Sequence, residues 1–295
     1  MSLQPKTLLE LGRVSNLPTV WSNVLTGAAL SGASLSPAPL AIAGLAGSLF
    51  YVGGMFLNDA FDAEIDARER PERPIPSGRA TRRQVFAIGT ALLGGGLALL
   101  ALSAALGSSP SGLALPAAGL ATALAVVFYD RFHKGVAWSP LVMGLCRAGL
   151  YVIGALSVSP HLPELTLLGA GALLLYVVGL THIARFETAS AVGRLWPTAL
   201  LFTPVSLTLA RAEAGGGLDP ILLGLVAVSA GWTLRALRFA RQGGRNIGRA
   251  VVTLIAGISF VDAAFSALAG ARVLAGFAFA CAVLTLLGQK KIRGT

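Results

Sequence analysis

Apolar stretches of about twenty residues follow one another along almost the whole chain. This feature restricts the fold most, because about twenty residues of α-helix cross the hydrocarbon core of a bilayer. Windows of about nineteen residues give these candidate spans: 16–34, 38–60, 84–107, 112–129, 139–158, 164–184, 195–211, 218–238, 248–269 and 271–288. Only a few residues around Gly270 separate the last two, so a count of nine is also open. Charged residues make up 12% of the chain, about half of the fraction in soluble domains. The sequence therefore predicts an all-α membrane protein, a bundle of nine to ten transmembrane helices without a separate soluble domain.

The distribution of lysine and arginine predicts how this bundle is oriented. All of the 23 basic residues except Arg147, Arg211 and Arg272 fall at the N-terminal side of the predicted membrane or in loops that return to it. Because cytoplasmic loops are enriched in Lys and Arg, we expect both the N- and the C-terminus in the cytoplasm. The net charge of +10 does not indicate nucleic acid binding, since no soluble domain carries a basic binding face.

The segment 1–15, ahead of the first span, is expected to form an interfacial helix, because Leu8 and Leu11 recur at helical spacing. It lacks a compact apolar run followed by a small-residue cleavage site, so we expect no removable signal peptide. Together with the short loops, this favours the inner membrane of a bacterium. The cysteines, Cys146 and Cys281, both lie in apolar stretches, which excludes a multi-cysteine metal site.

The acidic residues are concentrated at one place. Six of the 13 lie between positions 59 and 72, at the end of the second predicted span. Asn58, Asp62 and Asp66 are four residues apart and share one face of a helix, and Asp59 lies one step round the same end. Their oxygens suit Mg²⁺, which proteins commonly hold with one or two carboxylates, retained waters and substrate phosphates. The spacing is equally compatible with a solvated helix end whose acids are balanced by nearby arginines.

The segment 58–80 reads NDAFDAEIDARERPERPIPSGRA, and its pattern NDxxDxxxD followed by RPxPSGR resembles the first aspartate-rich motif of the UbiA superfamily of intramembrane prenyltransferases. Together with YDRFHK…MGLCRAG at 129–149 and THIARFE at 181–187, it is most similar to the divergent EboC-like branch. The resemblance covers residues 1–295 as a single domain, with 271–288 as an extra C-terminal helix.

The resemblance implies a helical bundle around a lipid-open central cavity whose active site faces the cytoplasm. In that cavity Mg²⁺ is expected to bind the diphosphate of a polyprenyl donor. The metal ligands that the motif implies are Asn58, Asp59, Asp62 and Asp66.

The second acidic motif of the superfamily is replaced by THIARFE, which holds the single carboxylate of Glu187. Arg185 is expected to contact phosphate directly in place of metal charge, because a guanidinium binds phosphate bidentately. Glu187 and His182 are candidate metal ligands, although a loop acid paired with Arg185 and a helix-end histidine stay open as alternatives. The number of Mg²⁺ ions also stays open.

Two charged residues fall inside predicted spans, Arg147 in the fifth and Asp262 in the ninth. A charge there is costly unless it faces a cavity or a partner, so each is a site hypothesis. A structural role, with the two paired to each other or to backbone, is the alternative. Arg147 and Lys134 are expected at the mouth of the cavity and are assigned to the diphosphate, together with Arg73 and Arg79.

These residues predict an enzyme that transfers a prenyl group from a polyprenyl diphosphate to a small acceptor inside the membrane. The catalytic candidates are Asp62, Asp66, Arg147 and Glu187, and a general base could be Glu187, Asp130 or Asp66. The superfamily implies an aromatic acceptor, whereas the EboC-like branch suggests a polar cyclitol-like or sugar-like headgroup. The competing functions are a membrane transporter and a catalytically degenerate, prenyltransferase-like lipid-binding protein. A transporter needs ligands near the membrane midplane, whereas these acids lie at one mouth.

Overall fold

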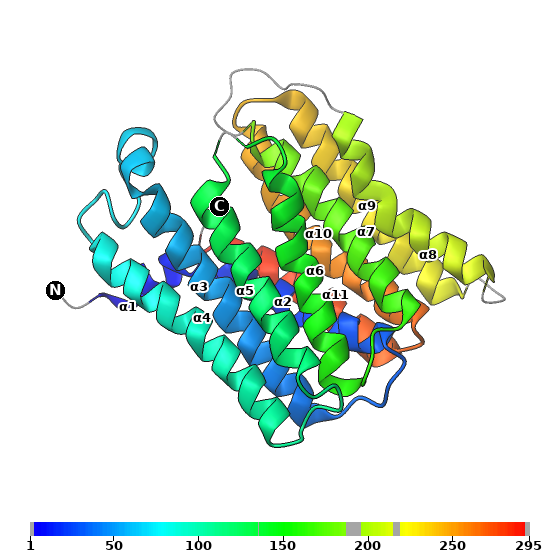
Figure 1. Ribbon diagram of the computed structural model, residues 1–295. Coiled ribbons are helices and arrows are strands. Elements are labelled where there is room, and N and C mark those ends of the chain that lie inside the picture. The colour runs from blue at the N-terminus through cyan, green and yellow to red at the C-terminus, as the bar shows by residue number, and fades with distance from the viewer. Residues whose placement is uncertain (1–2, 135, 187–195, 215–218, 293–295) are drawn as a thin grey trace.

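The computed structural model describes residues 3–134, 136–186, 196–214 and 219–292, and within these ranges all regular secondary structure is helical. The helices are α1 (Pro5–Leu11), η1 (Val14–Asn16), α2 (Leu17–Leu30), α3 (Pro37–Glu69), α4 (Arg82–Ala105), α5 (Ala114–Phe132), α6 (Ser139–Val158), α7 (Glu164–Ala184), η2 (Trp196–Phe202), α8 (Thr203–Ala214), α9 (Pro220–Gln242), α10 (Asn246–Leu268) and α11 (Arg272–Gln289). The long helices pack side by side as one bundle (Figure 1). The prediction of an all-α fold is confirmed.

Eight of the helices in the described ranges are long and apolar enough to cross a bilayer, namely α3 to α7 and α9 to α11. The remaining two predicted spans, 16–34 and 195–211, correspond to shorter elements. In the first, α2 has 14 residues, and in the second the 3₁₀-helix η2 precedes α8, which has 12 residues. Hydropathy windows register composition and not backbone geometry, so they do not detect where an α-helix ends or follows a 3₁₀ segment.

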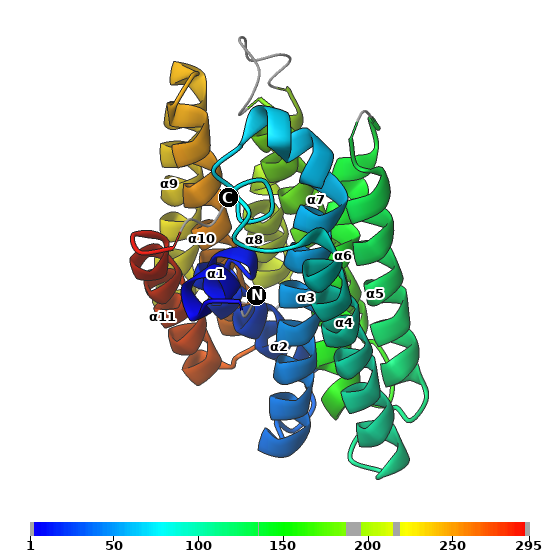
Figure 2. The same cartoon turned by 90° about the vertical axis from the view of Figure 1, so that its left-hand side faces the viewer.

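The central helices of the bundle are α2 and α6, which pack against each other and against neighbours on both sides. Figure 2 shows α3, α4 and α5 on one side and α9, α10 and α11 on the other. Two glycines allow α2 and α6 to cross in close contact. A Cβ atom on Gly27 would overlap the backbone of Tyr151, and one on Gly154 would overlap the carbonyl of Val24. Small residues at helix crossings let two backbones approach closely.

The helix α3 is longer than a membrane span requires. Its 33 residues extend over about 50 Å at 1.5 Å per residue, so its last turns carry Asn58 to Asp66 beyond the apolar part. A proline-rich turn then leads to α4, where Thr81 forms a capping box. Its hydroxyl accepts a hydrogen bond from the Gln84 backbone N–H, and the Gln84 side chain accepts one from the Thr81 backbone. This cap fixes where α4 begins.

The first and last helical segments meet at one end of the bundle. The C-terminal helix α11 packs against α10, α2 and η1, and Gln289 Nε2 donates a hydrogen bond to Asn16 Oδ1 at 2.9 Å. The N-terminal segment is not one helix over 1–15, because α1 ends at Leu11 and Arg13 adopts a left-handed conformation with φ of 42° before η1. Leu11 is fully buried in a small cluster against α3.

Candidate active site

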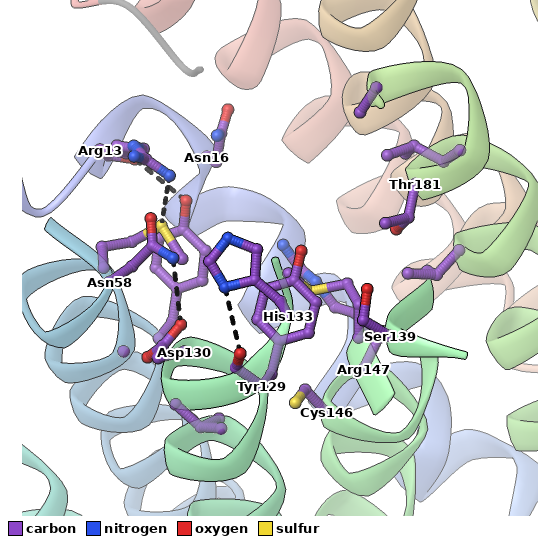
Figure 3. A pocket seen from close by; sticks show the side chains of 18 of the residues that line it. Arg13, Asn16, Asn58, Tyr129, Asp130, His133, Ser139, Cys146, Arg147 and Thr181 are labelled. Atoms are coloured by element: carbon purple, nitrogen blue, oxygen red, sulfur yellow. Dashed lines mark hydrogen bonds between the residues drawn. The ribbon is translucent and has the colours of Figure 1, made fainter. Parts of the chain in front are cut away.

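A cavity of about 790 Å³ opens within the helical bundle. Its walls come from η1 and the residue preceding it, α3, α5, α6, α7 and α10. Charged and polar side chains gather towards the C-terminal ends of α3 and α5, as the labelled residues show (Figure 3). The remaining walls are apolar and include Phe50, Leu150, Val177, Ile255 and Ile258. The cavity therefore combines a polar part with an apolar part inside one helical bundle.

The acidic face of α3 lines this cavity with Asn58, Asp62 and Asp66, as their four-residue spacing predicts. Asp59 is not among the lining residues. Its carboxylate accepts hydrogen bonds from Arg13 at 3.1 Å and from Arg73 at 3.3 Å. Arg73 also donates to Asp66 Oδ2 at 2.8 Å. Both arginines line the cavity, so the Asp59 carboxylate anchors two cationic residues at its rim.

The charge of Arg13 is maintained by this pairing. Burial is the largest single effect and disfavours a charged guanidinium. The nearby acidic groups together, Asp59 foremost, outweigh it and raise the pKa of Arg13 above its usual value. Arg13 Nη1 also lies 3.2 Å from the Met55 sulfur. The cavity rim therefore holds a permanently cationic group next to the acidic face of α3.

The opposite wall, at the end of α5, places basic groups near Asp62. Lys134 Nζ lies 3.4 Å and His133 Nε2 lies 3.6 Å from Asp62 Oδ2. The His133 ring stacks on Tyr129, with ring centroids 4.9 Å apart. One turn above, Asp130 accepts a hydrogen bond from Asn58 Nδ2 at 3.3 Å.

Asp130 is a buried carboxylate with spare bonding capacity. Its residue is 4% exposed and lines the cavity, yet its Oδ2 atom has no hydrogen-bond partner among the described residues. Buried carboxylate oxygens are normally paired. The unpartnered oxygen therefore marks a position where a proton, a cation or a donor group of a ligand would be accommodated.

Arg147 enters the cavity from α6, on the side facing α2. Its Nη1 atom donates to Thr19 Oγ1 and to Asn23 Oδ1, each at 3.0 Å. The guanidinium carbon lies 5.4 Å from the centre of the Tyr51 ring, a cation–π distance. The structure thus places a cation inside the bundle, against both polar and aromatic partners.

Of the remaining predicted site residues, some line the cavity and others lie outside it. Arg185 lines the cavity and donates to the Ser139 hydroxyl at 2.7 Å and to the Val136 and Ala137 carbonyls. Arg79 does not line it and pairs with Glu10. Glu187 lies outside the described residues. His182 packs edge-to-face on Phe186 and is not a lining residue.

The cavity offers oxygen ligands of the kind that suit Mg²⁺. Among the described residues, no three His, Cys, Asp or Glu side chains come close enough together to hold a metal ion. The donor set nevertheless fits, because Asn58, Asp62 and Asp66 direct hard oxygen atoms into one cavity and Mg²⁺ usually completes its coordination with waters and substrate phosphates. The basic residues around them would pair with the same phosphates. The arrangement suits a metal ion that binds together with an anionic ligand.

Comparison with known proteins identifies the family. A model of the UbiA prenyltransferase family matches residues 18–249. This chain belongs to that family. The digeranylgeranylglyceryl phosphate synthase of Ignicoccus hospitalis is 31% identical to it over 180 residues, which are 61% of this chain and 56% of that relative. The matched part therefore spans little more than half of the curated relative.

Solved structures of UbiA homologues share the fold. The apo structure of a UbiA homologue from Aeropyrum pernix superposes with a TM-score of 0.65 at 21% identity, over 85% of this chain and 96% of that one. A UbiA homologue from Archaeoglobus fulgidus bound to GPP and Mg²⁺ gives a TM-score of 0.60 at 13% identity, over 89% and 99%. With these relatives and its apolar helices, the UbiA family member described here is an integral membrane protein.

Three cavity residues of this UbiA family member are not singled out by its sequence pattern, namely Arg13, Tyr51 and His133. Arg13 resembles an ordinary topology signal, and its partner Asp59 is 46 residues away. His133 lies in the YDRFHK stretch beside Lys134. Its position one helical turn after Tyr129 is the sequence feature that would place it on the same side of the helix.

Proposed function

We propose that this protein transfers a prenyl group from a polyprenyl diphosphate to a small acceptor within the membrane, in the presence of Mg²⁺. The observation that carries the proposal is one cavity in which the acidic face of α3 lies opposite Lys134, Arg147 and Arg185, with apolar walls continuing from them. A diphosphate fits the charged part and an isoprenoid chain fits the apolar part. The GPP and Mg²⁺ bound by the Archaeoglobus fulgidus homologue support this donor class.

In the proposed mechanism, Asn58, Asp62 and Asp66 would hold Mg²⁺, and the bound ion would neutralise charge on the diphosphate. Lys134 and Arg147, with Arg185, would donate hydrogen bonds to the diphosphate and stabilise the charge that develops as the allylic C–O bond breaks. The apolar walls around Phe50 and Ile258 would hold the chain and keep water away from the allylic cation.

An acceptor that loses a proton needs a base in the same cavity. We assign this role to Asp130, because its unpartnered oxygen lies in the wall of the cavity. Asp66 suits the role less well, since Arg73 already donates to it at 2.8 Å. Arg73 would act at the rim, where it guides the donor, and Arg79 would contribute only to the positive field outside the cavity.

Three resemblances suggest different classes of acceptor. The EboC-like stretches suggest a polar cyclitol-like or sugar-like headgroup, and the superfamily suggests an aromatic ring. The relative from Ignicoccus hospitalis is a digeranylgeranylglyceryl phosphate synthase, which adds a glyceryl phosphate type of acceptor. We propose a polar headgroup as the first class to test, because the lining residues around Asp130 and His133 offer it hydrogen bonds.

We further propose a topology of nine to ten membrane-spanning segments, with α2 and the η2–α8 pair as short spans. The N- and C-termini and the polar end of the cavity would face the cytoplasm of a bacterial cell, as the excess of Lys and Arg on that side indicates. The apolar part of the cavity would be open to lipid. Cysteine accessibility at position 6 and at position 272 would test this orientation.

The donor site can be tested without knowing the acceptor. Geranyl and longer prenyl diphosphates are expected to raise the thermal midpoint of the detergent-purified protein, because a ligand that binds only the folded state stabilises it. At a ligand concentration of 100 times Kd the gain is about 2.7 kcal/mol. Removal of Mg²⁺ with a chelator should abolish most of this shift.

The competing functions give different results in this experiment. A transporter or a degenerate lipid-binding protein that does not use the α3 carboxylates would show a shift that is independent of Mg²⁺. A protein that binds no diphosphate at any chain length would contradict the donor assignment. A prenyl diphosphate shift that requires Mg²⁺, without transfer to any acceptor class, would identify a catalytically degenerate family member.

A further inference from the structure

The strongest unexplained feature outside the cavity wall is the buried carboxylate of Asp262 on α10. This residue is 0% exposed and does not line the cavity. Its oxygens accept hydrogen bonds from Tyr151 on α6 at 2.6 Å, and from Ser22 and Asn23 on α2. A carboxylate in the middle of a membrane bundle is costly. Its burial with hydrogen-bond partners on two helices therefore indicates a role other than packing.

Asn23 connects this carboxylate to the cavity. Its amide nitrogen donates to Asp262 at 2.9 and 3.1 Å, while its amide oxygen accepts from Arg147 Nη1 at 3.0 Å. An amide can be turned by half a revolution, which exchanges donor and acceptor. With Asp262 ionised, the turned orientation would bring oxygen against carboxylate and N–H against guanidinium. The carboxylate therefore selects the amide orientation in which the Asn23 oxygen accepts a hydrogen bond from Arg147.

The hydrogen bonds of Arg147 lie on one side of its guanidinium, whose carbon is also 5.4 Å from the centre of the Tyr51 ring. Its Nη1 atom makes both hydrogen bonds to α2, and the other guanidinium N–H groups have no hydrogen-bond partner among the residues that the structure describes. The side chain lines the cavity and is labelled there in Figure 3. A guanidinium fixed through one nitrogen presents its remaining donors in a defined direction, which favours phosphate binding.

We propose that Asp262 is a positioning residue for Arg147. Its carboxylate fixes the orientation of the Asn23 amide, and Asn23 in turn holds the guanidinium with its free donors directed at the diphosphate of the donor. The inference rests on the proposed function of the cavity, and it adds a residue that touches neither substrate nor metal. The path runs from α10 through α2 to α6, so the three helices set the direction of one cation.

The first variant is Asp262→Asn, which keeps the shape of the side chain. The introduced amide oxygen can still accept from Tyr151 at the Oδ1 position, and the new NH2 group at the Oδ2 position can donate to the Ser22 hydroxyl. That NH2 group also lies against the Asn23 nitrogen. Asn23 should then turn and present a donor to Arg147. We expect the dissociation constant of inorganic pyrophosphate with Mg²⁺, and that of geranyl diphosphate, to rise about tenfold, as for loss of one charge-assisted hydrogen bond.

Two further variants separate positioning from a general structural role. In an Arg147→Met background, Asp262→Asn should cause no additional weakening, because the group that it orients is already gone. The exchange Asn23→Asp combined with Asp262→Asn keeps net charge and volume and returns an acceptor to Arg147. This exchange should restore the dissociation constant of pyrophosphate to within about twofold of the wild-type value. A twofold change is smaller than the effect expected from loss of one hydrogen bond.

A matched control lies one turn along the same helix contact. Ser266 on α10 hydrogen-bonds Thr26 on α2 at 2.9 Å. In the part of the chain that the structure describes, it forms no hydrogen bond with Asn23 or Arg147. Ser266→Ala therefore disturbs the α2–α10 packing without changing the proposed path. It should leave the dissociation constant of pyrophosphate unchanged, even where the thermal midpoint falls.

The results divide the hypotheses clearly. Unchanged pyrophosphate binding in Asp262→Asn, a further loss in the Arg147→Met background, or failure of the charge exchange to restore binding would each overturn the positioning role. If Asp262→Asn alone does not fold, the exchange variant decides, since a folded exchange variant with weak binding contradicts the inference. A wild-type protein that binds neither ligand would instead refute the proposed function, and the positioning role with it.

Discussion

Replacing Asp62 with asparagine is expected to lower prenyl transfer by at least about a hundredfold, the size of effect seen when one electrostatic stabiliser is removed from an active site. Asp62 is the middle residue of the acidic face of α3 and lies within 3.6 Å of both His133 and Lys134. The amide retains the shape of the side chain but removes the negative charge that a magnesium ion requires. Transfer rates and Mg²⁺-dependent thermal shifts should both be lost.

The control for this variant lies two residues away on the same helix. The Glu64 side chain is 78% exposed and pairs with Arg82 outside the cavity, and exposed ion pairs contribute about 0–1 kcal/mol. Glu64→Gln removes one carboxylate from α3, as Asp62→Asn does, and should leave transfer unchanged. Equal losses in both variants would mean that general charge on α3, rather than a ligand position, supports activity.

The second large effect is expected at the crossing of α2 and α6. A methyl group on Gly154 would overlap the carbonyl of Val24, and a backbone atom cannot move aside as a flexible side chain does. Gly154→Ala should therefore destabilise the fold by about 3 kcal/mol, at the upper end of the range for overpacked cores. Because the same two helices carry Thr19, Asn23 and Arg147, the variant protein that does fold should also bind pyrophosphate more weakly.

Gly171 provides the matched control for this prediction. It lies in α7, and a Cβ atom placed on it would meet no atom within 4 Å. Alanine is the better helix former by about 1 kcal/mol in aqueous helices, so Gly171→Ala should keep or raise the thermal midpoint. A Gly154→Ala protein as stable as the wild type would show that α2 and α6 are not locked at this point.

The part of the site that the sequence predicts is the part built from one helix. Asn58, Asp62 and Asp66 reach the same cavity because four-residue spacing on a helix is enough to align them. Residues next to a predicted span end, such as Lys134 and Arg185, also reach it. Their positions follow from local periodicity and from the order of the spans.

The part that the sequence does not predict depends on contacts between distant segments. Asp59 lies one step round α3 from Asn58, and its partner Arg13 is 46 residues away in sequence, so helical spacing does not predict their pairing. Asp262 and Arg147 are connected, yet through Asn23 and not by direct pairing. The shortness of α2 also escapes a hydropathy window, because α2 ends at Leu30 while the turn after it, with Gly32 at φ of 68°, still falls within the predicted span.

The hydrogen bond between Gln289 and Asn16 has a consequence for synthesis of the chain. Asn16 lines the cavity, and it is held by a residue that leaves the ribosome some 270 positions later. The wall of the cavity at Asn16 is therefore not complete when the acidic face of α3 has been inserted, but only once α11 packs against η1 and α2.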